Sequence, residues 1–294
     1  MLTGLIRLAR PTHWIKNVFV LIPAPFALAA AAKDPSVSFH FETAGFLMGL
    51  LGFSLINSAV YTLNDLLDAE ADRLHPKKRL RPIAAGLVSP RAAIVQIGVL
   101  ALLGLALCIA TGKPAAAWLV VAYSVINLAY SLGAKHIALL DVFLLSSGFV
   151  IRVLLGCVLV DAQASSWLLL CTSSLALFLG FTKRRGDLRA GLDGKHRPSL
   201  RGYSQAFLDQ AITICAGVAL LAYALYSIDA EVFRPGREMA SMPLVAYGIF
   251  NYLRLADMAD NGGSSPVHIA YHSRSSQICA IGWIIAVTWG LGIW

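Results

Sequence analysis

Three aspartates and an asparagine follow an apolar stretch at a spacing that could hold a metal ion. In the run NDLLDAEADRLHPKKRLRP, Asp65, Asp68 and Asp72 occur at i, i+3 and i+7, and Asn64 precedes them. On a helix these three carboxylates share one face, whereas Glu70 lies off it. Their mutual repulsion would be removed by Mg²⁺, which takes oxygen ligands and completes its shell with water and substrate phosphates. We therefore predict a metal-phosphate site here; the alternative is a solvated amphipathic helix end.

Basic side chains predict binding of phosphate groups. One cluster ends the acidic run, and a second, TKRRGDLRAGLDGKHRPSLRGYS, follows a later apolar stretch. Arg152 lies within an apolar stretch, where an arginine is costly and by default indicates a functional site. Asp141 precedes it by eleven residues, so on a helix the two project from nearly the same face about 16 Å apart. The alternatives are a basic loop that only sets membrane orientation, and a snorkelling or structurally paired arginine.

The composition indicates that most of the chain lies in a lipid bilayer. Of 294 residues, 57% are hydrophobic and 14% charged, against about 25% charged in soluble domains. About 20 apolar residues span a bilayer as a helix. We predict a single all-α membrane domain, residues 1–294, with nine spans near 17–32, 43–63, 91–110, 115–133, 138–160, 166–182, 206–228, 239–256 and 276–294.

The lysines and arginines predict the orientation of these spans. With a cytoplasmic N-terminus, 19 of the 24 fall on the cytoplasmic side, as the positive-inside rule requires. The net charge of +8 thus belongs to one membrane face. This positive charge suits anionic lipid or phosphorylated substrates. We expect no nucleic-acid partner, because the sequence contains no nucleic-acid recognition module. The first span could alternatively be a cleaved signal peptide.

Several motifs resemble the UbiA superfamily of intramembrane prenyltransferases. NDLLDAEADRLHPKKRLRP is similar to its first aspartate-rich motif, and nine spans with the N-terminus inside also match. RPTHWIKNVFVLIP, YSLGAKHIALLDVFLLSSGFVIRVLLG and WLLLCTSSLALFLGFTKRRGDL resemble the branch of decaprenyl-phosphate phosphoribosyltransferases. The resemblance covers essentially the whole chain. It implies a UbiA-like helical bundle in the inner (plasma) membrane, with its active site at the cytoplasmic face.

The resemblance implies an enzyme that transfers the 5-phosphoribosyl group of phosphoribosyl pyrophosphate to a polyprenyl (decaprenyl) phosphate, a step in cell-wall arabinan synthesis. Asp65, Asp68 and Asp72 would be catalytic and, with Asn64, would hold Mg²⁺ against the pyrophosphate. The lipid chain would lie in an apolar groove between helices. A homo-oligomer is compatible with the sequence. The expected substrate-binding residues are Lys16, Asn17, Lys78, Arg81, Lys135, Asp141, Arg152, Lys183 and Arg184.

Two other functions remain open from the sequence. A prenyltransferase acting on an aromatic acceptor should carry a second acidic motif, but this chain has KRRGDL there. Direct phosphate binding by Lys and Arg would replace that second metal cluster. A lipid carrier or transporter would place ionisable groups at the bilayer midplane, with inverted repeats. The chain also departs from the branch in GGSSPVHIAYHSRSS, where His272 stands in place of an expected acidic residue.

Overall fold

The described part of the chain is mostly helical. The computed structural model describes residues 2–34, 41–74, 78–192, 197–229, 232–258, 269 and 272–293, and contains no strand in these ranges. The predicted all-α fold is confirmed. Most of the segment before His272 lies outside the described residues.

The helices are α1 (Leu2–Ala9), η1 (Pro11–Val20), α2 (Pro23–Lys33), α3 (Thr43–Leu67), α4 (Ala69–Leu74), η2 (Lys78–Leu80), α5 (Pro90–Ala110), α6 (Pro114–Leu132), η3 (Ala134–His136), α7 (Leu140–Leu159), α8 (Ser166–Arg189), η4 (Pro198–Gly202), α9 (Gln205–Asp229), α10 (Met242–Met258) and α12 (Arg274–Leu291).

Seven helical segments of the described chain are long and apolar enough to cross a membrane. They are Thr3–Lys33, Thr43–Leu67, Pro90–Ala110, Pro114–Leu132, Leu140–Leu159, Ser166–Arg189 and Gln205–Asp229. The chain is therefore a multi-pass membrane protein. The other two predicted spans correspond to α10, which has 17 residues, and α12, which begins with the polar run RSSQ. The count of nine spans remains a prediction.

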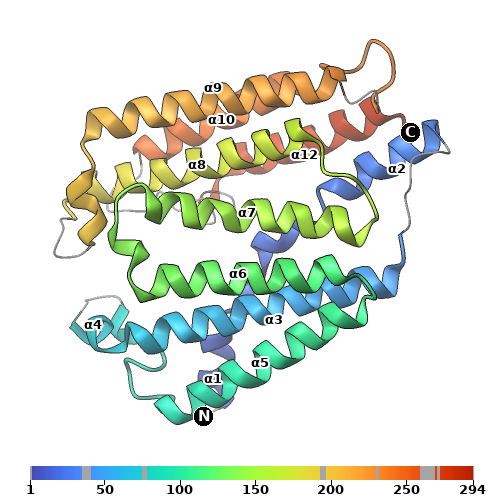
Figure 1. Ribbon diagram of the computed structural model, residues 1–294. Helices are drawn as coiled ribbons and strands as arrows, with labels where there is room; N and C mark the ends of the chain where they lie inside the picture. Colours follow the sequence, from blue (N-terminus) through green and yellow to red (C-terminus); the bar gives the residue numbers. More distant parts are fainter. Residues whose placement is uncertain are drawn as a thin grey trace. The chain divides into compact units, whose positions relative to one another are not determined.

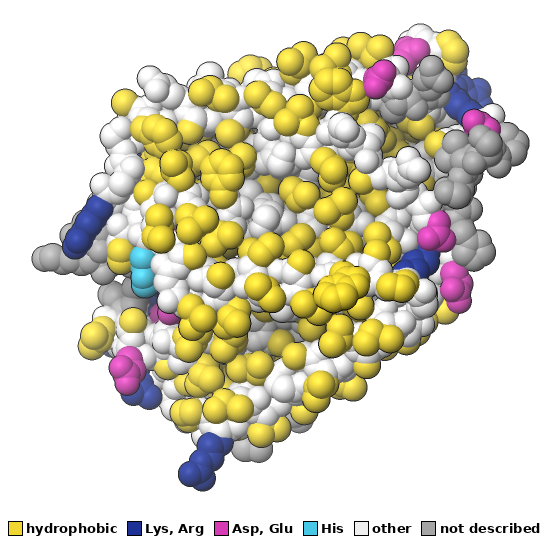
Figure 2. All heavy atoms as spheres, in the orientation of Figure 1, with side chains coloured by type: hydrophobic (Ala, Val, Ile, Leu, Met, Phe, Trp, Pro, Cys, Tyr) yellow, Lys and Arg dark blue, Asp and Glu magenta, His cyan; other side chains and the backbone are white. Residues whose placement is uncertain are grey.

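The outer surfaces of these helices suit contact with lipid. Trp118 is 73% exposed and Leu102 is 72% exposed, on α6 and α5 respectively. Figure 2 shows apolar side chains over the helix surfaces in view, with charged side chains near helix ends. Backbone groups inside the helices are satisfied within each segment, as a bilayer requires.

The chain forms two compact units, and the first contains the predicted carboxylates. It comprises residues 1–23, 40–132 and 151–162. Within it α3 packs on α1, α5 and α6 (Figure 1). A Cβ added to Gly52 on α3 would lie 2.7 Å from the carbonyl oxygen of Gly104 on α5. Glycine at this crossing therefore lets the two backbones approach closely, as in many membrane helix pairs.

The second unit comprises residues 24–39, 133–150 and 163–294. In it α8 packs on α9 and α10, and α10 packs on α9 and α12 (Figure 1). Its buried core includes Phe178, Leu208 and Ile212. Ser165 caps the N-terminus of α8 by accepting a hydrogen bond from the backbone N–H of Leu168 at 3.0 Å. A cap of this kind satisfies one of the free donors at a helix start.

Of the five lysines and arginines that the predicted topology leaves off the cytoplasmic side, Arg152 lies within a span, and the other four all donate hydrogen bonds to backbone carbonyls. Three of them do so at the C-terminal ends of α7 and α12, where a cation is favourable. The pairs are Lys113 with Val158 and Leu159, Arg234 with Gly292, Arg237 with Trp289, and Lys33 with Phe233. These exceptions to the charge asymmetry thus have local structural partners.

The predicted orientation of the spans can be tested with a reporter fused to the C-terminus. Nine spans with a cytoplasmic N-terminus require an external C-terminus. A reporter that is active only in the cytoplasm, fused after Trp294, is therefore expected to be inactive, while the same reporter in the loop after α4 is expected to be active. A cytoplasmic signal from the C-terminal fusion would contradict the nine-span topology.

Candidate active site

The predicted carboxylates lie at the end of α3 and in the short helix that follows. Asp65, in the last turn of α3, and Asp72, in α4, are each 2% exposed, and Asp68 is half-buried. The three aspartates do not lie on one uninterrupted helix, because α3 ends at Leu67 and α4 begins at Ala69. The helix is interrupted at Asp68, which has φ −89° and ψ 0°. Aspartate favours helix ends because its side chain competes for backbone hydrogen bonds.

Two arginines neutralise these carboxylates. Arg81 Nη1 lies 3.1 Å from Oδ1 of Asp65 and 2.6 Å from Oδ2 of Asp72. One guanidinium contacts both carboxylates, so Asp65 and Asp72 lie close to the same cation. Arg10 Nη2 lies 2.5 Å from the same Oδ1 of Asp65. The repulsion between the carboxylates is thus compensated by two cations in this structure.

The residues around Asp65 fit a divalent cation. Its Oδ2 atom is buried and has no hydrogen-bond partner among the described residues. Such an orphaned anionic oxygen is costly unless a ligand or ion completes it. Asn64 contributes an amide oxygen from the same turn, which accepts a hydrogen bond from Ser131. The described chain shows no group of three His, Cys, Asp or Glu side chains assembled for a metal. Mg²⁺ needs only one or two carboxylates, since water and phosphate supply the rest.

The segment η1 brings Lys16 to α3. A 3₁₀ helix has three residues per turn, which puts Trp14 and Asn17 on one side and Lys16 on another. Trp14 Nε1 donates to Ser58 Oγ at 2.9 Å, and Lys16 Nζ lies 3.5 Å from the hydroxyl of Tyr61. The guanidinium of Arg10 also lies over the Tyr61 ring, 5.2 Å from its centroid. Tyr61 precedes Asp65 by one turn, so Arg10 and Lys16 are held beside the acidic site.

Arg152 is buried in a polar core of the first unit and does not snorkel. It is 4% exposed. Its Nε donates to Asn17 Oδ1 at 3.0 Å and its Nη2 to Asn57 Oδ1 at 2.8 Å. The guanidinium also lies 5.1 Å from the ring centroid of Phe53 and 5.3 Å from that of Tyr123. Neutral oxygens and aromatic faces therefore support this charge, and Asn17 links it to η1.

Arg184 occupies a buried position in the second unit. Its residue exposure is 0%, as is that of Asp141. Its Nε lies 2.8 Å from Oδ2 of Asp141, and its Nη1 lies 2.9 Å from Oδ2 of Asp187. Two carboxylates therefore hold the guanidinium on separate nitrogens. This geometry favours an anchoring role over direct contact with a substrate phosphate.

The neighbouring basic residues differ in exposure. Lys183 is exposed and Lys135 is half-buried. Arg185 pairs with Asp209 at 3.0 Å and with Asp257 at 2.7 Å, which ties α8 to α9 and α10. The basic cluster therefore combines ion pairs between helices with a lysine at the surface.

The predicted site residues thus form two groups, each within one unit. The first unit holds Lys16, Asn17, Asn64, Asp65, Asp68, Asp72, Lys78, Arg81 and Arg152, of which Lys78 is exposed. The second holds Lys135, Asp141, Lys183 and Arg184.

Sequence reasoning missed Arg10, Tyr61 and Asn57. Arg10 has φ 49°, a left-handed conformation unusual for any residue but glycine. Its place directly before Pro11 indicates only that a helix ends there, because proline disfavours a right-handed helical conformation in the residue before it. Tyr61 and Asn57 lie within an apolar span and carry no local signal.

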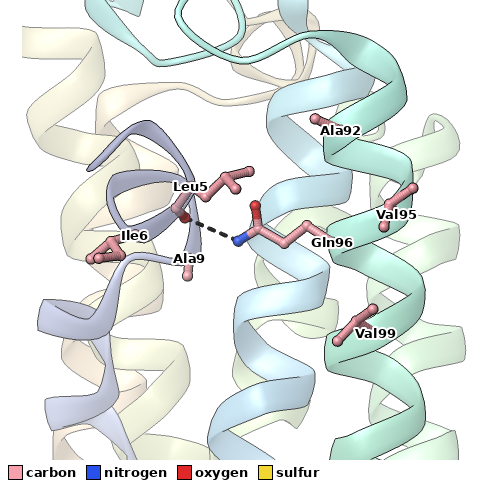
Figure 3. A pocket seen from close by; sticks show the side chains of 7 residues that line it. All are labelled: Leu5, Ile6, Ala9, Ala92, Val95, Gln96 and Val99. Atoms are coloured by element: carbon pink, nitrogen blue, oxygen red, sulfur yellow. Dashed lines mark hydrogen bonds between the residues drawn. The ribbon is translucent and has the colours of Figure 1, made fainter. Parts of the chain in front are cut away.

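Two apolar grooves are present in the first unit. One, of about 460 Å³, lies between α1 and α5 (Figure 3). Its Gln96 Nε2 donates to the carbonyl of Leu5 at 3.0 Å, and it contains none of the predicted site residues. The other, of about 480 Å³, lies between η1 and α3 and is lined by Trp14, Ile15, Asn17, Val18, Leu21, Leu47, Leu50, Leu51 and Ser54.

Comparison with known proteins identifies relatives along nearly the whole chain. The protein is 33% identical to a decaprenyl-phosphate phosphoribosyltransferase of Mycolicibacterium smegmatis, over 97% of this chain and 91% of that protein. It is 32% identical to a decaprenyl-phosphate phosphoribosyltransferase of Corynebacterium glutamicum, over 97% and 85% of the two chains.

A solved structure shares the fold. It is a UbiA homolog from Archaeoglobus fulgidus bound to GPP and Mg²⁺, with a TM-score of 0.71 and 19% identity, covering 97% of this chain and 99% of that one. The sequence profile of the UbiA prenyltransferase family matches residues 20–272. These matches agree with the helical membrane fold and with the acidic run at the end of α3. The chain belongs to the UbiA prenyltransferase family.

Proposed function

We propose that the protein transfers the 5-phosphoribosyl group from phosphoribosyl pyrophosphate to a polyprenyl monophosphate at the cytoplasmic face of the plasma membrane. The observation that carries the proposal is the acidic site at the end of α3, with its orphaned Asp65 oxygen beside Arg10 and Arg81. The end of α8 carries mainly arginines and lysine where a second acidic site would be expected. The matches to decaprenyl-phosphate phosphoribosyltransferases support the same substrates.

The first unit is proposed to bind the pyrophosphate of the sugar donor. Asp65, Asp68, Asp72 and Asn64 would hold Mg²⁺, which when bound supplies positive charge to the leaving pyrophosphate. Arg10, Lys16, Lys78 and Arg81 supply further positive charge from the protein. Since Arg81 already contacts two carboxylates, we propose that it also fixes their orientation. Arg152 holds η1 through Asn17 and so keeps Lys16 beside α3.

The reaction needs little acid–base chemistry. An oxygen of the lipid phosphate attacks the anomeric carbon as the bond from that carbon to pyrophosphate breaks. The attacking phosphate is already ionised at neutral pH, so no strong base is required. The protein contributes mainly by positioning the two substrates and by stabilising charge.

The groove between η1 and α3 supports the lipid part of the proposal. Its walls are mostly apolar, and its polar lining residues Asn17 and Ser54 are hydrogen-bonded to each other at 2.8 Å. A polyprenyl chain could bury apolar surface against the leucines that line it.

One assay tests the function. Purified protein is given ribose-labelled phosphoribosyl pyrophosphate, polyprenyl phosphate and Mg²⁺, and the lipid is then extracted. We expect labelled lipid only when all three are present, and loss of labelling when the metal is chelated. Prenyl diphosphate with an aromatic acceptor serves as the control reaction. Product from that pair alone would identify an aromatic prenyltransferase, and no product from either would contradict both enzymes.

A further inference from the structure

Asp141 is a fully buried carboxylate that accepts hydrogen bonds from two segments of the second unit, α8 and the chain around η4. The hydroxyl of Tyr203 donates to its Oδ1 at 2.6 Å. Ser199 Oγ and Arg184 Nε donate to its Oδ2 at 2.9 Å and 2.8 Å. Arg197 Nη2 lies 3.5 Å from the same oxygen. A carboxylate with this many donors, most of them buried, is strongly held in one position.

Tyr203 also fixes the turn that precedes α7. Its hydroxyl oxygen accepts a hydrogen bond from the backbone N–H of Leu139 at 2.7 Å. Leu139 has φ +67°, a left-handed conformation that costs free energy for a residue with a side chain. Burial, together with the hydrogen bond to Asp141, raises the pKa of Tyr203, so the hydroxyl stays protonated and can keep donating. One hydroxyl therefore holds both the carboxylate and the strained turn.

The same turn carries a predicted phosphate ligand. Lys135 lies in η3, four residues before Leu139. The segments η3 and η4 are in contact, and a Cβ added to Gly202 in η4 would lie 2.5 Å from the Cβ of Ala138. Close packing of η4 and the Tyr203 hydroxyl thus constrain the path of the chain from Lys135 to α7. On α8, Lys183 directly precedes the anchored Arg184.

We propose that Tyr203 and Ser199 are positioning residues that act through Asp141 to hold Lys135 and Lys183 where they contact a substrate phosphate. The inference rests on the proposed function, and goes beyond it by assigning a role to two residues outside the metal site. Neither residue needs to touch substrate. Misplacement of a binding group by about 1 Å can cost up to a hundredfold in rate.

The test uses Tyr203→Phe, which keeps the ring stacked on Phe207 and removes only the hydroxyl. The assay uses the full-length protein with labelled phosphoribosyl pyrophosphate and polyprenyl phosphate. We expect the KM for one of these two substrates to rise about tenfold. Ser199→Ala should act in the same direction with a smaller effect. Tyr247→Phe, which removes a hydroxyl from a side chain on α10 that is 51% exposed, is the matched control and should match the wild type.

A double-mutant cycle separates positioning from a purely structural role. If Tyr203 acts by placing Lys135, the Lys135→Ala change should cost at least threefold less in the Tyr203→Phe background than in the wild type. Independent effects of the two changes, or a lowered melting temperature with unchanged KM values, would overturn the inference while leaving the function intact. A wild-type protein that labels no lipid would overturn the proposed function, and this inference with it.

Discussion

Replacing Asp65 with asparagine is expected to reduce phosphoribosyl transfer by about a thousandfold. The change removes the buried negative charge that faces Arg10 and Arg81, and it removes the orphaned carboxylate oxygen proposed to bind Mg²⁺. Loss of metal-assisted stabilisation of a leaving group is worth several kcal/mol, and about 4 kcal/mol corresponds to that factor. The measurement is the initial rate of lipid labelling over a range of Mg²⁺ concentrations.

Glu70→Gln is the matched control for this variant. Glu70 lies in the same acidic run but is exposed. Removing its charge should leave the rate within about twofold, since exposed charges contribute little. Both variants should remain folded in detergent, as judged by size-exclusion chromatography and thermal melting, because asparagine is close in shape to aspartate and the partners of Asp65, Arg10 and Arg81, are partly exposed. Equal loss of activity at Glu70 and Asp65 would mean that the run acts through its overall charge and not through a defined site.

The sequence was sufficient to predict the fold class, and it predicted that the acidic run begins where an apolar helix ends. Long apolar stretches have few structures available to them in a bilayer, so composition alone predicts helices. The spacing of Asp65 and Asp72 predicted that the two carboxylates lie close together. In the structure Arg81 contacts both of them. The break at Asp68 was not predicted, because the pattern i, i+3, i+7 is the same with or without a local change of backbone angle.

The partners of the buried charges could not be predicted, because they are distant in sequence. Arg10 is 55 residues from Asp65, and Arg184 is 43 residues from Asp141. Neither pair produces a periodic signal. A basic run such as KRRGDL looks uniform in the sequence, yet the structure buries Arg184 completely and exposes Lys183 beside it. Only the packing of α8 distinguishes the two.

The difference in burial between Arg184 and Lys183 affects which of the two can bind a substrate phosphate. The Arg184 guanidinium is fully buried between two carboxylates, so a phosphate could reach it only by replacing one of them, whereas Arg10 and Arg81 are paired but partly exposed. Lys183 is exposed and Lys135 is half-buried, so both are accessible to a phosphate from outside the protein. In the second unit we therefore expect Lys183 and Lys135 to affect substrate binding, and Arg184 with Asp141 to affect the structure that carries them.

Arg184→Ala is accordingly expected to destabilise the protein strongly. It would leave Asp141 and Asp187 without the guanidinium that contacts both. Removing one partner of a buried ion pair typically costs about 3–5 kcal/mol. The measurements are the melting temperature in detergent and the yield of folded protein at a fixed expression level. Arg91→Ala, which removes an exposed arginine at the start of α5, should leave both unchanged.

Two further variants decide how Arg184 acts. Arg184→Lys keeps the charge but has one nitrogen in place of the guanidinium fork, so it should recover only part of the lost stability. Lys183→Ala should show the opposite pattern, with a normal melting temperature and a KM for a phosphate substrate raised about ten- to a hundredfold, the loss of one charge-assisted contact. If Arg184→Ala instead melted like the wild type and raised KM, the guanidinium would leave its carboxylates to bind phosphate during turnover. In that case Arg184 would be a substrate ligand, and the buried ion pairs would describe only the resting enzyme.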